Sequence, residues 1–421
     1  MKRLIFITFF YLVPLFDTIT GLLFKLHLMG DASLGSPSQL VKFFLWLCFF
    51  REMTKNNNYT KTFGFILISL VYAVFESCIA VFYDNSFYAF SYGLLNIFKV
   101  TYLWLFFLCF DTFIKNQYVT LTELLHLFKL NGLICVSLIF LTMILHLSQP
   151  TYYEGTFGSK GLFLSGNGMS LYLGAISFLS LIIAKQEGGR KNYLQALYMI
   201  AGSTIIGTKA SIIFLLINFL YFCFAVVKHG KIFVFGFSLV LFIINFSFFE
   251  TVFDVIVSRF KNKGNLFTFL MSARDGFVKD ALAHFSTDGF LAIRIFTGLG
   301  AFLSFREPGT KLPFDTLEND VFDIFFMYGL IGLFFYISVI VYCFDKLLKK
   351  RQSIWLIFSS TIFVYSMIAG HSVFNQTSGI LIPLCVLISK YRVNFEPYKI
   401  PVRITKKSFN EPAVIKQRFL K

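Results

Sequence analysis

Apolar runs long enough to cross a membrane follow one another along most of this chain, separated by short polar connections. A transmembrane helix needs roughly 20 predominantly apolar residues. The stretch 193–227 is about twice that length and is broken by "GTKAS" at 207–211, which indicates two spans joined by a tight turn. The expected spans are 4–24, 33–50, 62–82, 89–110, 124–147, 166–184, the pair within 193–227, 232–250, 321–345, 353–371 and 376–390.

The composition indicates the same class of protein. With 57% hydrophobic and 14% charged residues, the chain has too little polar surface to cover a soluble globule. We therefore expect an all-α polytopic membrane protein with about twelve transmembrane helices. Residues 1–250 are expected to hold transmembrane helices 1–9, residues 251–320 one large external loop, residues 321–390 helices 10–12, and residues 391–421 a basic tail.

The distribution of Lys and Arg sets the expected orientation. Basic residues are retained on the cytoplasmic side of short loops, and here they concentrate in the tail and in alternate connections, which places both termini in the cytoplasm. This asymmetry, together with anionic lipid, accounts for the net charge of +16 without nucleic acid as a partner. Lys42, Lys99 and Lys129 lie in or near expected spans and do not enter this assignment.

Several motifs that carry chemistry are absent from the sequence. It contains no Walker loop, dinucleotide fingerprint, HExxH or nucleophile elbow, and its seven cysteines show no metal-binding spacing. These absences argue against ATP-driven transport, redox chemistry and zinc proteolysis. We expect no metal and no cofactor.

The external loop between about Glu250 and Asp320 is much longer than the other connections. Within it, the apolar residues of 266–285 recur at spacings typical of a helix that lies on the membrane plane. We expect this loop to cap the outer leaflet.

Charged residues that could carry chemistry are all expected at the outer face. Cationic side chains can hold a diphosphate while a carboxylate or imidazole accepts a proton from a hydroxyl, as glycosyl transfer from a lipid-linked diphosphate requires. The cationic candidates are Lys209, Arg259, Arg274 and Arg294, and the proton acceptors are Asp275, Glu318, Asp320 and His371.

Each candidate also has a simpler interpretation. An Arg in an external loop is usually a solvated charge. Lys209 could extend toward lipid phosphate, and His371 could cap the C-terminus of a helix. Asp323, one turn into its span, is expected to pair or cap, and the glycines of "YGLIG" (328–332) are expected to be close-packing positions between spans.

The order of the motifs resembles the O-antigen polymerase and O-antigen ligase superfamily over roughly residues 155–375. The residues that carry the resemblance are "GLFLSGNGMSLYLG" (161–174), "GTKAS" (207–211), "SARDGF" (272–277), "FTGLG" (296–300), "END" (318–320), "MYGLIGL" (327–333) and "GHSVF" (370–374). Ligases typically have a histidine just before the "GLIG"-like span. This chain has "LEND" there and His284 much earlier, which favours a polymerase.

The resemblance implies a GT-C-like fold in the bacterial inner membrane, with the active site facing the periplasm. It implies glycosyl transfer from undecaprenyl diphosphate-linked repeat units, without nucleotide or metal, with membrane lipids and a chain-length regulator as further partners. Lys209, where the family often has Arg, and Arg274 would stabilise the diphosphate, with Arg259 and Arg294 as further candidates. The proton acceptor would be Glu318 or Asp320, followed by His371 or Asp275.

Two alternatives to a polymerase remain. A ligase would deliver finished glycan to lipid A core, and its product would be found on lipid A rather than on the lipid carrier. A lipid-linked oligosaccharide flippase or other secondary transporter usually shows two related halves and intramembrane charges along a path. The sequence indicates neither, because its charges collect in one external loop.

Overall fold

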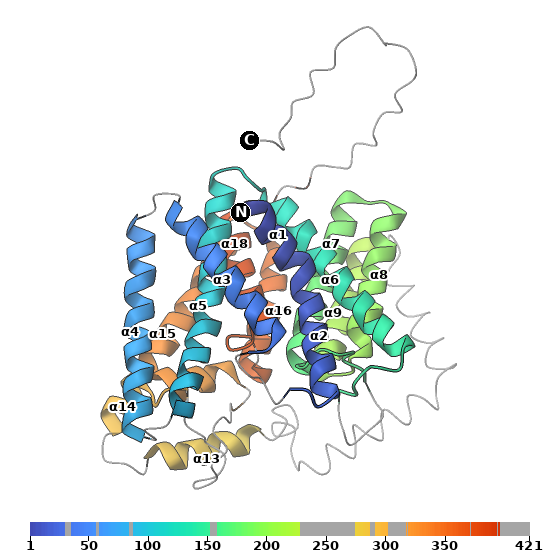
Figure 1. The fold of residues 1–421 in the computed structure, drawn as a ribbon. Coiled ribbons are helices and arrows are strands. Elements are labelled where there is room, and N and C mark those ends of the chain that lie inside the picture. Colours follow the sequence, from blue (N-terminus) through green and yellow to red (C-terminus); the bar gives the residue numbers. More distant parts are fainter. Residues whose placement is uncertain are drawn as a thin grey trace, which may run out of the picture.

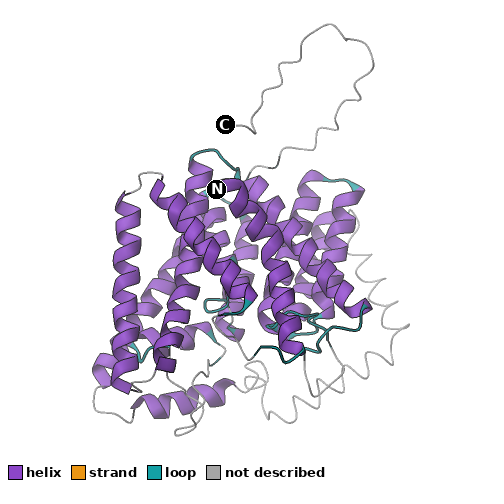
Figure 2. Cartoon of the chain, in the orientation of Figure 1, coloured by secondary structure: helices purple, strands orange, loops and turns teal. Residues whose placement is uncertain are grey.

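The computed structural model describes residues 1–29, 35–55, 59–83, 87–151, 158–227, 274–286, 291–301, 317, 319–370, 372–393 and 395. Over these residues the chain is helical, without strands, apart from a single antiparallel bridge between Pro150 and Ser159 (Figure 2). The elements are α1 (Lys2–Ile7), a π-helical turn (Thr8–Leu12), α2 (Val13–Lys25), α3 (Pro37–Lys55), α4 (Tyr59–Tyr83), α5 (Phe87–Lys115), α6 (Leu121–Ile144), α7 (Gly166–Glu187), α8 (Arg190–Ile205), α9 (Lys209–Tyr221), a second π-helical turn (Phe222–Val226), α13 (Arg274–Ser286), α14 (Leu291–Thr297), α15 (Asp320–Lys349), α16 (Ser353–Ala369), α17 (Gln376–Gly379) and α18 (Leu381–Lys390).

The described helices confirm the all-α class and the membrane-spanning character. Seven of them are long and apolar enough to cross a membrane: Lys2–Lys25, Tyr59–Cys78, Gly93–Lys115, Leu121–Ile144, Gly166–Glu187, Lys209–Val226 and Asp320–Lys349. Helices α3, α8, α16 and α17–α18 coincide with other expected spans but are shorter or less apolar. The expected span 232–250 lies outside the described residues, so the number of about twelve stays a prediction.

The helices run between two ends of one bundle (Figure 1). At the end that carries the N-terminus, which we call the basic end, the Lys2 ammonium lies over the Tyr118 ring, and Lys61 and Lys390 both donate to Asp111. The opposite end, which we call the loop end, holds segments 158–165 and 372–375, the N-termini of α7, α9 and α15, and helices α13 and α14 (Figure 1).

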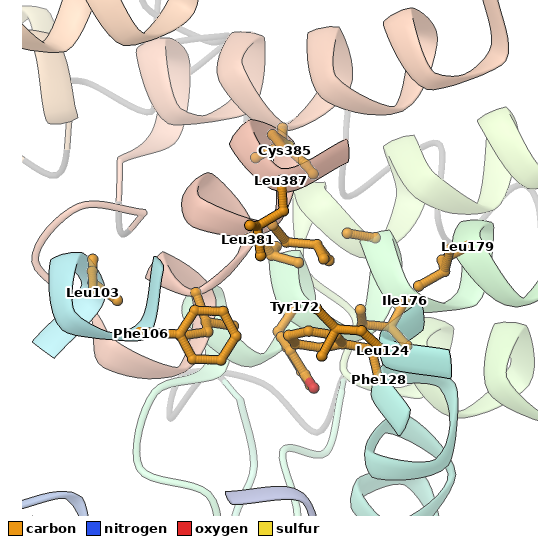
Figure 3. Packing of buried hydrophobic residues seen from close by; sticks show 14 of the residues in the cluster. Leu103, Phe106, Leu124, Phe128, Tyr172, Ile176, Leu179, Leu381, Cys385 and Leu387 are labelled. Atoms are coloured by element: carbon orange, nitrogen blue, oxygen red, sulfur yellow. The ribbon is translucent and has the colours of Figure 1, made fainter. Parts of the chain in front are cut away.

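Helix α7 forms the centre of the bundle. Its most apolar stretch is 94% buried, against 11% for that of α4, which lies at the edge (Figure 1). Small residues explain this position because they let neighbouring helices approach closely. A Cβ at Gly174 would lie 2.3 Å from the Phe214 ring of α9, and Asn218 of α9 donates to Ser177 at 2.9 Å. Figure 3 shows Tyr172 and Ile176 of α7 among core residues of α5, α6 and α18.

Helix α13 lies across the loop end, roughly perpendicular to the bundle (Figure 1). It coincides with the C-terminal part of the helix expected over 266–285, whereas 266–273 lie outside the described residues. Its Ala281 and Phe285 are buried in a small cluster with Phe326 of α15. The position of α13 relative to a membrane plane stays a prediction.

A kink at Gly329 lets the segment after α14 pack against the backbone of α15. Gly329 has a φ of 62°, and a Cβ there would lie 2.3 Å from the carbonyl of Phe296. Leu299 N donates to Phe326 O at 2.9 Å across this contact. Gly329 is therefore a close-packing position as expected, but its neighbour is the segment "FTGLG" (296–300) rather than another span.

Candidate functional site

Several residues of the sequence-predicted site cannot be placed. Arg259, Glu318 and His371 lie outside the described residues. Arg274 and Asp275 begin α13 at the loop end, but only their backbone is described. Their proposed roles stay predictions.

Asp320 and Asp323 are both buried and hold the N-terminus of α15 in place. Asp320 Oδ2 accepts hydrogen bonds from the Ser366 hydroxyl and, at 2.9 Å, from Ser372 N, which ties α15 to the end of α16 and to the segment after it. Asp323 accepts from Leu317 N at 2.6 Å and from Asn319 N at 3.2 Å. The expectation that Asp323 pairs or caps is confirmed, and Asp320 has a similar anchoring role.

Lys209 and Arg294 both lie at the loop end but on different helices. Lys209 is the exposed first residue of α9, which packs against α7 and α8 and is capped by the Thr208 hydroxyl. Arg294 is buried in α14, which packs against α15. The two helices are drawn well apart in Figure 1.

A polar cavity of about 220 Å³ opens among the helices near the loop end. Five segments of the chain form it: the middle of α2, the start of α3, the middle of α5, the connection 163–165, and residues 374–377 at the start of α17. The polar residues that line it are Asp17, Thr20, Ser36, Ser38, Gln39, Lys42, Lys99, Ser165, Asn375, Gln376 and Thr377.

The N-termini of two long helices contribute to the cavity wall. Ser36 precedes α3 and accepts a hydrogen bond from Gln39 N at 3.3 Å, with Pro37 at the first helical position. Ser165 caps α7 by accepting from Gly168 N at 3.1 Å. Both helix dipoles therefore present their positive ends here, which favours negative charge in the cavity.

Two lysines fix the connection that leads into α7, one within it and one at the end of α2. Lys160 donates to Leu164 O at 3.0 Å, and burial lowers the pKa of Lys160 below its ordinary value. Lys25 donates to Leu147 O at 2.9 Å at the start of the same connection. Gly168 allows close packing, because a Cβ there would lie 2.5 Å from the Asn375 amide. This contact joins "GLFLSGNGMSLYLG" to the segment after "GHSVF".

Two lysines in the cavity differ in how their charge is balanced. Lys42 is 6% exposed and donates to Asp17 Oδ1 at 2.8 Å and to the Ser38 hydroxyl at 2.9 Å. Lys99 lines the same cavity, and no described residue accepts a hydrogen bond from it or forms an ion pair with it. An ammonium within a membrane-spanning helix is costly unless it is paired or hydrated. Lys99 is therefore suited to an anionic ligand.

A second chamber of about 30 Å³ extends the cavity toward the centre of the bundle. Asp17, Lys42 and Gln376 line both chambers. The deeper chamber ends at Asn131, which donates to Phe10 O at 2.8 Å in the first π-helical turn and accepts from the Tyr172 hydroxyl. Figure 3 shows the Tyr172 hydroxyl within the core.

Gln376 is buried to 7% exposure, and neither polar atom of its amide has a hydrogen-bond partner in the described part of the chain. Buried amides are normally satisfied. A ligand with hydroxyl groups would satisfy this one. Within the described residues, no group of three His, Cys, Asp or Glu side chains could hold a metal ion.

The cavity corrects one sequence-based expectation. Charges do not collect only in the external loop, because Asp17, Lys42 and Lys99 all lie within expected spans and line one cavity. Sequence reasoning missed this group, although an ionisable residue within an apolar span is itself a signal of function. Comparison of the sequence with known protein families and with curated proteins gives no match.

Proposed function

We propose that the protein is a surface-polysaccharide polymerase. It transfers a growing glycan from undecaprenyl diphosphate onto a hydroxyl of an incoming lipid-linked repeat unit. One observation carries this proposal. Two of the segments that resemble the superfamily, 161–174 and 370–374, line the same cavity as Lys42 and Lys99, together with the residues that follow the second segment. A diphosphate is the leaving group of such a transfer, and its developing negative charge needs cationic donors.

The cavity supplies groups for both parts of a lipid-linked sugar. Lys99, with the N-termini of α3 and α7, offers positive charge to the diphosphate, while the charge of Lys42 is balanced by Asp17. The amide of Gln376 and the hydroxyl of Thr377 offer hydrogen bonds to sugar. Arg274, Arg259, Arg294 and Lys209 stay candidates for the diphosphate, and Glu318, Asp320, His371 and Asp275 stay candidates for proton transfer, from the external side.

The orientation is part of the proposal. Lys61, Lys115, Lys350 and Lys390 gather at the basic end, which the positive-inside tendency assigns to the cytoplasm. The cavity then faces the periplasm, where lipid-linked repeats are polymerised. An alkaline phosphatase fusion after Gly264 is expected to be active and one after Gln352 inactive, measured by colony colour and enzyme assay. The reverse pattern contradicts the orientation.

The function is tested with purified protein in proteoliposomes that contain one synthetic undecaprenyl diphosphate-linked repeat unit. The expected product is a ladder of longer glycans that remain on the lipid carrier. Glycan on added lipid A core, with no ladder, would indicate a ligase instead. Wild-type protein that makes neither product contradicts glycosyl transfer.

A flippase or other secondary transporter is a second candidate, favoured by the charges within the membrane-spanning helices. The transporter and the polymerase can be distinguished by placing a fluorescent lipid-linked oligosaccharide in the inner leaflet of the same proteoliposomes. A transporter makes the label accessible to an external quencher without lengthening the glycan. A polymerase lengthens the glycan of repeat units that are already accessible.

A further inference from the structure

Asp17 on α2 is the carboxylate that lines both chambers of the cavity. Its Oδ1 accepts hydrogen bonds from the Ser38 hydroxyl and from Lys42 Nζ, the latter at 2.8 Å. Its Oδ2 accepts no hydrogen bond from any described residue. One oxygen therefore fixes the carboxylate to α3, and the other is left for a group that enters the cavity.

The start of α3 holds this carboxylate in one orientation. Ser38 N donates to the Thr20 hydroxyl at 2.9 Å, one turn along α2 from Asp17, while the Ser38 side chain and Lys42 contact Asp17 itself. The Asp17 side chain is 11% exposed, so little solvent competes for Oδ2. A fixed, partly dehydrated carboxylate oxygen is a good proton acceptor for a hydroxyl placed within hydrogen-bond distance.

The two lysines of the cavity have different roles. Lys42 is balanced by Asp17, whereas Lys99 has no partner within the described residues and is available to an anion. Lys99 and Asp17 line the same larger chamber. A donor whose diphosphate contacts Lys99 would therefore bring its anomeric carbon into the chamber that Asp17 also lines.

Asp320, which the sequence also predicts as a proton acceptor, lies away from the cavity. Its Oδ2 is engaged by the Ser366 hydroxyl and Ser372 N, and Asp320 is not among the residues that line either chamber. Asp17 lines both chambers.

We infer that Asp17 is the catalytic residue that accepts the proton of the acceptor hydroxyl, an inference that rests on the polymerase function proposed above. The hydroxyl oxygen forms a bond to the anomeric carbon of the donor sugar, and the bond from that carbon to the diphosphate oxygen breaks. The electron pair of the broken bond leaves with the diphosphate, whose charge Lys99 stabilises. The hydroxyl proton passes to Asp17 Oδ2 and then to water.

The test uses full-length protein in proteoliposomes with the lipid-linked repeat unit. Asp17→Asn keeps an oxygen acceptor for Ser38 and Lys42 but cannot take a proton. Its turnover is expected to fall by about 10² to 10⁴, with the KM for the repeat unit changed by less than about threefold. Asp17→Ser is a second neutral variant that keeps an oxygen for Lys42, in case the first does not fold.

The matched control is Asp111→Asn, which also neutralises a buried carboxylate but lies at the basic end and lines neither chamber. Its turnover per folded molecule is expected to stay within about twofold of wild type, because its partners Lys61, Lys390 and Tyr391 are outside the cavity. Turnover within fivefold of wild type in either folded Asp17 variant overturns the role of Asp17 and leaves the polymerase function standing. Wild-type protein that forms no glycosidic bond overturns both.

Discussion

The two ends of the bundle use buried charge differently. At the basic end, Asp111 is a carboxylate with 1% side-chain exposure that accepts from Lys390 and the Tyr391 hydroxyl at 2.6 Å and from Lys61 at 3.0 Å. Near the loop end, Asp17 has one oxygen engaged, and Lys99 has no protein partner within the described residues. The first group is complete by itself, whereas the second has room and charge for something else.

This difference separates structural charge from functional charge. A carboxylate surrounded by donors from α4, α5 and the end of α18 holds those helices together and gains nothing from a ligand. A charge kept inside a membrane-spanning bundle without a partner costs stability, so it is retained for a reason. Completeness of pairing is therefore a better guide to the site than the number of charges at either end.

Among the variants that test the difference between the two ends, Lys99→Ala is expected to have the largest effect. Lys99→Ala removes the unpaired cation, and turnover in the reconstituted assay is expected to fall by about 10² to 10³, as when one donor to a developing negative charge is lost. Lys99→Arg is expected to retain part of the activity. The matched control is Lys129→Ala, which removes a buried lysine that already donates to Asn192 at 2.9 Å. If Lys99→Ala and Lys129→Ala lose the same turnover per folded molecule, the proposal that unpaired charge marks the functional site is contradicted.

The second variant, Asp111→Ala, tests the basic end, where we expect stability to change and turnover to stay the same. Asp111→Ala leaves three lysines close together without their carboxylate. Breaking a fully buried pair costs about 3–5 kcal/mol. These lysines are partly exposed, so we expect about 2 kcal/mol in thermal or denaturant unfolding, with turnover per folded molecule unchanged.

Asp345→Ala is the control for this measurement, because Asp345 pairs with Lys349 at an exposed site and should change stability by less than about 0.5 kcal/mol. A stability change for Asp111→Ala no larger than that of Asp345→Ala would remove the structural role assigned to the basic end.

The sequence predicts the secondary structure better than the site. Apolar runs are local, so the helices could be placed from span length, and Asp323 could be recognised as a capping residue from its position one turn into a span. Asp17, Lys42 and Lys99 lie in three separate expected spans. Only the packing of α2, α3 and α5 around the 163–165 and 374–377 connections brings them together. Nothing local in the sequence encodes that arrangement.

The smallest effect is expected for Lys209→Ala. This variant tests whether the residue chosen from the sequence or the cavity found in the structure binds the diphosphate. The resemblance implies that Lys209 stabilises the diphosphate. In the structure Lys209 is exposed at the start of α9 and is not among the residues that line the cavity. An exposed charge typically contributes about 0–1 kcal/mol, so we expect Lys209→Ala to lower turnover less than about tenfold. Lys185→Ala, an exposed lysine near the other end of α7, is the control and should leave turnover unchanged. A loss as large as that of Lys99→Ala would mean that the diphosphate reaches α9, and the binding site would then extend from the cavity to the face that the sequence predicted.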